Sequence, residues 1–380
     1  MQRAGGENQL MREPFDKGKI RLLVSWCALL VLGYISATIT MADVLHDQKV
    51  SAITRHLLRL DPHKVEAGRT ALETQKFDLG REPLNIKVKT GIYVDRIFDV
   101  VLRHIHWKVD FYIWFTWTGP NVHPGDNFQI INGEIIAKEL KTKTDVGDIH
   151  YELYRVTAEI TKLFNITRYP RDNHMMTILI EDTRHQSFDL TYVPDAEDSA
   201  ISSRVKIPGY EIWRKGLVEK DHSYKTRRGD PRLPEGYKST YSQLVFGIGI
   251  KRASWGLYLK MFVGIFAAVC LSMLAFFISP AHTSPRFAIG IGAFFASIAS
   301  IYVISSQIPL SSAYTLTDFV TASSVITIFM TLLTSTISVG IYHRWQAGKA
   351  WASRLDRTAQ IIFLIGYTTL SVTLAWNASL

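Results

Sequence analysis

Charged residues are distributed very unevenly along this 380-residue chain. The last third contains four long apolar segments, and each can cross a hydrocarbon core of about 30 Å as a helix. These segments are Trp255–Ser279, Pro285–Gln307, Leu316–His343 and Thr358–Trp376. The pattern predicts an all-α transmembrane domain of four helices over residues 253–380.

A further apolar segment lies near the amino terminus, from Leu22 to Ala42, and Lys17, Lys19 and Arg21 precede it. A positive flank followed by an apolar run describes either a cleaved signal sequence or a retained anchor helix. Its 21 uncharged residues are long for a signal and sufficient to span a membrane. Both alternatives stay open, and both deliver the following domain outside the cytoplasm.

Between these apolar regions, short runs alternate apolar and polar residues with a period of two, as in Lys108–Trp117. Turn-like pieces such as Gly119-Pro120-Asn121 separate the runs. Many short strands at regular spacing indicate an all-β sandwich, so the fold class is mixed. The predicted parts are a cytoplasmic tail with the signal or anchor, a helical or loop segment, an extracytoplasmic sandwich and the four-helix domain: residues 1–42, 43–82, 83–252 and 253–380.

The short connection after the third of the four spans sets the expected orientation, because an excess of Lys and Arg marks cytoplasmic loops. It contains four basic residues and one acid, Arg344, Lys349, Arg354, Arg357 and Asp356. Residues 343–357 are therefore expected in the cytoplasm. The chain is then a multi-pass protein of the cell (inner) membrane, with its β domain periplasmic or extracellular.

Composition narrows the function further. The net charge is +9, but Lys and Arg alternate with Asp and Glu without a long basic run, so nucleic acid is not an expected partner. Cys27 and Cys270 lie in apolar segments and have no metal-ligand spacing. We find no paired acid and base, no nucleophile motif and no metal-spaced His/Glu set, so neither enzyme activity nor a cofactor is expected.

The segment from Phe164 to His174 reads Phe-Asn-Ile-Thr-Arg-Tyr-Pro-Arg-Asp-Asn-His. Locally it predicts an extended X-Pro turn with an aspartate able to accept backbone hydrogen bonds. It resembles the hallmark loop of pentameric ligand-gated ion channels, the Cys-loop receptor superfamily, where an aromatic-Pro-x-Asp core joins two strands. Its position midway through the predicted sandwich, before four membrane spans, supports the resemblance.

The resemblance covers about residues 83–376 in unbroken order. The family's first two strands, the strand before the loop and the junction to the first channel helix have counterparts at residues 92–117, 147–156 and 250–252. Two features are similar to the prokaryotic members. Lys162 and Met176 stand where animal receptors have the two loop cysteines, and the linker before the last span is short.

This resemblance implies a homopentamer in a lipid bilayer that conducts permeant ions passively and is gated by a small-molecule or proton agonist. The loop aspartate, Asp172, is expected to pair with Arg252 and couple the sandwich to the channel helices. The alternative is that both are solvated interfacial charges. The residues implied in gating and coupling are Arg168, Tyr169, Pro170, Asp172, Arg252 and Pro309.

The second channel helix is expected to line the pore. Its outer end is anchored on Pro309 and its inner end on Arg286, and the lining residues then alternate spacings of four and three on one face. They are Ala288, Gly292, Phe295, Ala299, Tyr302 and Ser306. Five copies of Phe295 are expected to form an apolar gate that closes by dewetting. An interpretation based on a polar stripe instead favours Ser297 and Ser300.

The inner mouth of the pore contains Arg286 and no acid, similar to the Pro-Ala-Arg entry of anion-selective members. A ring of Arg286 is therefore expected to favour anions or to leave selectivity weak. The alternative is that this side chain only reaches the cytoplasmic headgroups.

The ligand is expected to bind between subunits, against aromatic walls. A long basic loop, about residues 219–238, resembles the loop that caps this site, and its charge favours an anionic ligand. His104 and His106 leave protons or a metal as an alternative. The candidate ligand residues are Phe188, Tyr192, Tyr210, Trp213, Tyr224, Arg227 and Tyr237. The rival function is a non-conducting membrane sensor that uses the same sandwich.

Overall fold

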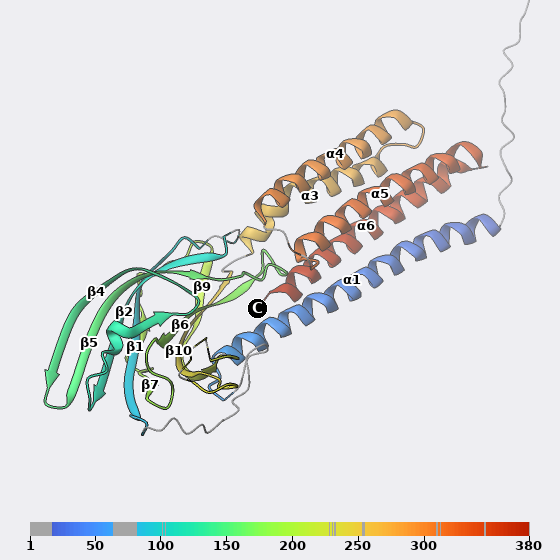
Figure 1. Cartoon of the computed structure of the whole chain (residues 1–380). Helices are drawn as coiled ribbons and strands as arrows, with labels where there is room; N and C mark the ends of the chain where they lie inside the picture. Colours follow the sequence, from blue (N-terminus) through green and yellow to red (C-terminus); the bar gives the residue numbers. More distant parts are fainter. Residues whose placement is uncertain are drawn as a thin grey trace, which may run out of the picture. The chain divides into compact units, whose positions relative to one another are not determined.

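The structure is a computed structural model in which, along the chain, a long helix precedes the strands of two β-sheets and further long helices follow them (Figure 1). It describes residues 17–63, 82–100, 102, 104–227, 229, 231, 233–252, 255–308, 311, 313–345 and 347–379. Contacts divide the chain into two units, which are described separately. The helical unit comprises Met1–Lys49, Ile166–Arg171 and Ser254–Leu380, and the β unit comprises Val50–Asn165 and Asp172–Ala253.

Two sheets build the β unit. The six-stranded sheet has the order β4-β5-β2-β1-β7, with β8 paired to β1, and the four-stranded sheet has the order β3-β6-β10-β9. The strands are β1 (Ile86–Phe98), β2 (His106–Thr118), β3 (Phe128–Ile130), β4 (Gly133–Val146), β5 (Ile149–Thr161), β6 (Asn173–Asp182), β7 (Leu190–Pro194), β8 (Ala200–Ile201), β9 (Tyr210–Ser223) and β10 (Thr240–Arg252). A short helix, α2 (Pro124–Asn127), precedes β3. The predicted strand domain is confirmed as two sheets.

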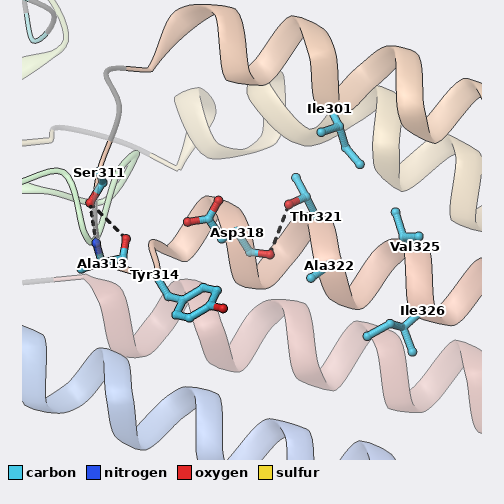
Figure 2. A pocket seen from close by; sticks show the side chains of 9 residues that line it. All are labelled: Ile301, Ser311, Ala313, Tyr314, Asp318, Thr321, Ala322, Val325 and Ile326. Atoms are coloured by element: carbon cyan, nitrogen blue, oxygen red, sulfur yellow. Dashed lines mark hydrogen bonds between the residues drawn. The ribbon is translucent and has the colours of Figure 1, made fainter.

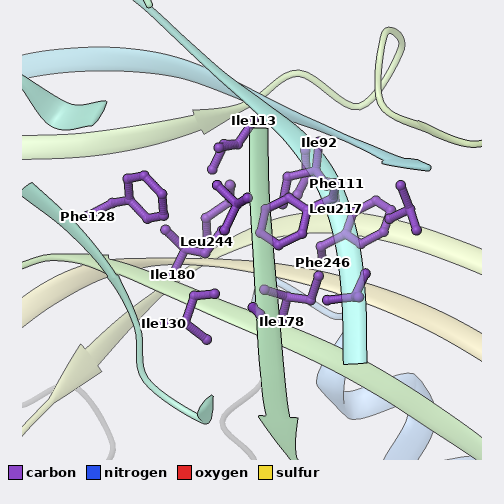
Figure 3. Packing of buried hydrophobic residues seen from close by; sticks show 14 of the residues in the cluster. Ile92, Phe111, Ile113, Phe128, Ile130, Ile178, Ile180, Leu217, Leu244 and Phe246 are labelled. Carbon is purple, nitrogen blue, oxygen red and sulfur yellow. The ribbon is translucent and has the colours of Figure 1, made fainter. Parts of the chain in front are cut away.

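Both sheets contribute to one apolar core, because alternate side chains of each strand point to the same face (Figure 3). Phe111 and Ile113 of β2 are fully buried, as are Ile180 of β6 and Leu244 of β10. Truncating a buried phenylalanine such as Phe111 to alanine costs about 3–5 kcal/mol. This core gives the β unit its rigidity.

Five helices among the described residues are long and apolar enough to cross a membrane. They are α1 (Lys17–Arg59), α3 (Gly256–Met273) with its 3₁₀ extension η1 (Leu274–Phe277), α4 (Thr283–Gln307), α5 (Leu316–Arg344) and α6 (Gly348–Ala378). The four apolar segments of the last third and the segment near the amino terminus are thus helical, as predicted. Helix α1 runs past the predicted boundary at residue 42, and residues 64–81 lie outside the described residues.

The buried face of α5 carries many hydroxyl side chains, next to a few large apolar ones such as Val320 and Ile328. The hydroxyl side chains recur at helical spacing, at Ser323, Ser324, Thr327, Thr331, Thr334, Ser335 and Ser338. Small residues let helices approach closely in a membrane, and their hydroxyls bond to neighbouring helices. Ser324 Oγ lies 2.7 Å from the Tyr367 hydroxyl of α6. Helices α5 and α6 lie side by side (Figure 1).

Helix α1 packs in the helical unit through specific polar contacts. The Tyr34 hydroxyl lies 2.8 Å from Thr327 Oγ1, and Trp26 Nε1 donates to Thr334 Oγ1 at 3.2 Å. The Tyr34 ring lies over Gly366 of α6, where a Cβ atom would come within 2.6 Å of the ring. These contacts make α1 a fifth packed helix of this unit.

The last turn of α1 belongs to the β unit. Lys220 Nζ of β9 donates to the carbonyl of Leu58 at 2.5 Å. The side chain of Leu60 covers Gly216 and Gly247, and a Cβ atom at Gly247 would lie 2.7 Å from it. Glycine at these two strand positions therefore makes room for Leu60 on the four-stranded sheet.

Candidate functional site

The predicted hallmark loop divides between the two units. Ile166–Arg171 belongs to the helical unit, although the residues before and after it belong to the β unit. The amide of Leu316 donates to the carbonyl of Thr167 at 2.7 Å, and the Thr317 hydroxyl donates to the carbonyl of Tyr169 at 3.1 Å. The loop therefore holds the first turn of α5, which a capping box also closes.

The two arginines of the loop reach other helix ends. Arg168 is buried, and its guanidinium donates to the carbonyl of Ala378 at the end of α6, at 3.2 Å. The guanidinium of Arg171 lies 4.6 Å from the centroid of the Trp255 ring, next to the first residue of α3. The predicted coupling residues Arg168, Tyr169 and Pro170 thus lie where three helices begin or end. Pro309 lies outside the described residues.

Asp172 follows this loop directly and belongs to the β unit, where it is 1% exposed. Arg252 Nε donates to its Oδ1 at 3.0 Å, and the Tyr210 hydroxyl donates to its Oδ2 at 3.1 Å. His174 Nε2 lies 2.5 Å from the same Oδ2. The predicted pair with Arg252 is formed, and its burial excludes the alternative of two solvated charges.

The charges of this cluster, defined as Asp172, His174, Tyr210 and Arg252, depend on one another. Burial by itself raises the pKa of Asp172, but the charge and hydrogen bonds of His174 and Arg252 outweigh it, so the pKa lies well below its ordinary value. Burial lowers the pKa of His174 and outweighs the opposing effect of Asp172. The ionised form of Asp172 is therefore favoured, whereas burial disfavours the charged form of His174.

The sequence-based prediction gave Tyr210 another role and did not include His174. Tyr210 was predicted to bind ligand, but its hydroxyl bonds to Asp172 and its ring lies 3.9 Å from the guanidinium of Arg252. His174 was not singled out. Asp172 lies directly before β6, and a spacing of two in extended chain puts its side chain on the same face as that of His174, which was the available signal.

The six predicted pore residues occupy the exposed face of α4. All six are exposed, and Phe295 and Tyr302 have 65% and 78% of their surface accessible. The buried face lies on the opposite side of the helix, at Arg286, Gly290, Ala293, Ser297 and Ile304. Ser297 is fully buried and donates to the carbonyl of Phe294 at 2.6 Å, so the alternative polar stripe does not coincide with the exposed face.

The prediction of an inner charge ring at Arg286 is wrong. The side chain is fully buried within the helical unit, and two of its nitrogens donate to Asp356 of α6 at 2.9 and 2.6 Å. Its Nε also donates to Ser335 Oγ of α5. A bidentate pair of this kind neutralises the arginine inside the helical unit. The acid was missed because the sequence alone counted Asp356 as a loop charge.

The predicted ligand residues are spread over the β unit. Tyr192 is 1% exposed and its ring centroid lies 6.3 Å from that of Phe115, so it is a core residue and not a wall of a site. Trp213 lies on β9, and Phe188 is half-buried in the segment between β6 and β7. Arg227 donates to the carbonyl of Leu233 within its own loop, at 2.8 Å.

The long basic loop is tied to the four-stranded sheet through an acid that the sequence did not reveal. Glu181 is fully buried, accepts from the Tyr224 hydroxyl at 3.0 Å and lies 2.5 Å from His222 Nδ1. At the other end of the loop, the Tyr237 hydroxyl donates to Gln186 at 2.7 Å. The two predicted tyrosines thus fasten both ends of the loop.

A basic pocket of about 620 Å³ opens on the six-stranded sheet. Asp110 is 1% exposed and binds Arg96 at 2.6 Å and Arg155 at 2.7 Å. Burial raises the pKa of Asp110, but its hydrogen bonds to the two arginines outweigh this effect and lower it. Arg204 and Lys206 also line the pocket, which therefore carries more positive than negative charge.

A second pocket, of about 580 Å³, lies on the helical unit beside α5 (Figure 2). Ile301 of α4 and Ala322, Val325 and Ile326 of α5 give it an apolar lining, and Tyr314 lies at one end. An apolar hollow on the surface of a membrane-spanning unit suits contact with lipid or with another helix.

The remaining candidates are the two histidines before and at the start of β2. The ring centroids of His104 and His106 lie 5.3 Å apart, and His106 Nδ1 lies 3.5 Å from Glu159. Among the described residues, no group of three or more His, Cys, Asp and Glu side chains is placed to hold a metal ion.

No model of a known protein family matches the chain, and no curated protein matches it either.

Proposed function

We propose that this chain is one subunit of a homopentameric ligand-gated ion channel, without catalytic activity, in which ions cross the membrane passively. The observation that carries the proposal is the face of α4 that stays exposed in the single subunit. The six residues that the family resemblance assigns to the pore all lie on this face, and other exposed residues such as Ile291, Ile298 and Val303 flank them. Five such faces around one axis form a water-filled column that Phe295 closes by dewetting.

The path of the chain supports a coupling role for residues 166–172. Asp172 is held in the β unit by Arg252, whereas the six residues before it hold the ends of α3, α5 and α6. A rearrangement of β6 and β10 that moves Asp172 therefore pulls directly on the loop. The ends of α5 and α6 follow because their hydrogen bonds to the loop are buried, and the start of α3 adjoins the loop through the contact of Arg171 with the Trp255 ring.

The ligand in this proposal is a small anion, with protons as the alternative. The basic pocket and the basic loop between β9 and β10 both favour a carboxylate, because arginine forks bind carboxylates through paired hydrogen bonds. The proton alternative rests on His174, whose protonation would place a second cation beside Arg252.

Selectivity is proposed to be weak. Arg286 is the only charged residue of α4, and Asp356 neutralises it. We further propose that α1 is retained, since its side chains contact α5 and α6, and that residues 343–357 face the cytoplasm.

Single-channel recording from purified protein in planar bilayers tests this proposal, with steps in pH and then additions of small carboxylates. The proposal expects gated unitary currents. Phe295→Ala should give channels that leak without agonist, whereas Ile298→Ala, an exposed apolar position beside the stripe, should keep the closed state.

The rival is a non-conducting membrane sensor, which the largely apolar character of the α4 stripe favours. If the chain is such a sensor, the unchanged protein and the Phe295→Ala variant should both bind ligand, and neither should carry current. Silent bilayers that contain correctly assembled, ligand-binding protein would decide for the sensor.

A further inference from the structure

Helices α1 and α6 form an apolar groove of about 590 Å³ within the helical unit. One wall consists of Val24, Ala28 and Val31, whose spacing of four and three places them on one side of α1. The other wall belongs to α6 and includes Trp351 and Arg354. The groove exists only because α1 packs beside α6.

Arg354 is the only charged side chain that lines the groove. Its guanidinium lies 4.8 Å from the centroid of the Trp351 ring, which positions it at one end of the apolar walls. Among the described residues, its N–H groups have no hydrogen-bond acceptor. The neighbouring acid, Asp356, is occupied by both nitrogens of Arg286. A charged, exposed guanidinium thus stands next to a long apolar surface.

More basic residues surround this end. Lys19 Nζ lies 5.3 Å from the centroid of the Trp345 ring, and Leu23 packs in one cluster with Leu355, so the start of α1 adjoins the end of α5 and the start of α6. The exposed basic residues that this arrangement gathers are Lys17, Arg21, Arg344, Lys349, Arg354 and Arg357. Such a concentration of positive charge at the end of spanning helices attracts anionic headgroups.

We propose that the groove binds an anionic glycerophospholipid of the surrounding bilayer, with one acyl chain between α1 and α6 and the phosphate on Arg354. The apolar walls match the chain, and the guanidinium matches the phosphate through charge-assisted hydrogen bonds. A zwitterionic lipid brings its own cation to the same place and binds less well. The inference needs only that these helices span a membrane, so it stands apart from the proposed channel function.

The test uses the full chain purified in detergent and titrated with phosphatidylglycerol or phosphatidylcholine, with bound lipid counted by native mass spectrometry. Phosphatidylglycerol should bind at least about tenfold more tightly, as expected for a hydrogen bond to a charged group. Arg354→Gln should remove that preference. Lys260→Gln, which removes the same charge from an exposed position of α3 outside the groove and outside this basic end, should keep it within about twofold.

A second pair of variants separates the groove from the charge. Ala28→Trp fills the groove and should abolish retention of either lipid, whereas Leu29→Trp, an exposed position outside it, should not. Equal binding of both lipids, or unchanged binding by Arg354→Gln and Ala28→Trp, would overturn the proposal. A change in subunit number in Ala28→Trp with an unchanged lipid count would instead assign the groove to a second copy of the chain.

Discussion

Two arginine–aspartate pairs are buried in the described part of the chain, and their surroundings differ. In the helical unit, Arg286 and Asp356 form a bidentate pair among α4, α5 and α6, with no titratable third partner in the hydrogen bonds described. In the β unit, Asp172 shares its carboxylate among Arg252, Tyr210 and a histidine. The first arrangement suits a permanent ion pair that holds three helices together. The second includes a histidine, so the charge of the cluster can change with pH.

The largest expected effect comes from breaking the helical pair. Asp356→Ala leaves the guanidinium of Arg286 buried without a partner, which should destabilise the helical unit by about 3–5 kcal/mol. Thermal unfolding of the detergent-solubilised protein, followed by circular dichroism, measures this loss.

A double variant sharpens the interpretation. Replacing the pair by Arg286→Met with Asp356→Leu removes both charges and should recover most of the stability. If the double variant is as unstable as Asp356→Ala, packing rather than the uncompensated charge dominates this site.

A smaller loss of stability is expected in the cluster around Asp172, because three side chains donate hydrogen bonds to its carboxylate and each supplies only part of the stabilisation. Asp172→Asn should lower stability by about 1.5–3 kcal/mol, the range for a hydrogen bond to a charged group. Exchange of the charges, with Asp172→Arg and Arg252→Asp together, should restore part of the gating lost in each single variant. Strictly additive effects in this double-mutant cycle would show that the two residues act independently.

The same junction should respond to pH. His174 has a lowered pKa in the folded state because of burial, so the unfolded chain binds a proton first and stability falls as pH drops below about 6.5. Asp172 has a lowered pKa as well, and its contribution is lost only as pH falls below its ordinary value near 4. Lys162 and Arg252 also oppose a positive charge on His174.

Unfolding measured from pH 7 to 5 checks this sign. His174→Gln should flatten the slope in that interval, and His104→Gln, at an exposed position, should leave it intact. A slope that survives in His174→Gln would place the titrating group elsewhere.

The smallest expected effect is at the contact between α1 and α5. Tyr34→Phe removes the hydrogen bond to Thr327 while keeping the ring over Gly366, and should cost about 0.6 kcal/mol. Thr327→Val is the matching change on the other helix, and the two losses should not add. Intact mass of the purified protein shows at the same time whether α1 is retained.

Periodicity predicted the strands and the spans because each records which residues face a core or lipid, and this local signal survives without tertiary information. The six positions of the α4 stripe came instead from the resemblance to the channel family, because the polar pattern alone favoured Ser297 and Ser300. Contacts between residues far apart in the sequence could not be predicted in this way. Nothing local places Asp356 beside Arg286, and nothing local distinguishes Tyr192, whose strand runs parallel to β1 and points it inward, from an aromatic wall of a site.

The central claim is that the exposed face of α4 lines a conducting pore. Thiol modification during single-channel recording tests it, in a background with Cys27→Ser and Cys270→Ser. A charged methanethiosulfonate should block current through Ala299→Cys and leave Ser297→Cys unaffected, because only the first position lies on the exposed stripe. Block at Ser297→Cys alone, or assembled protein that carries no current, would contradict the account.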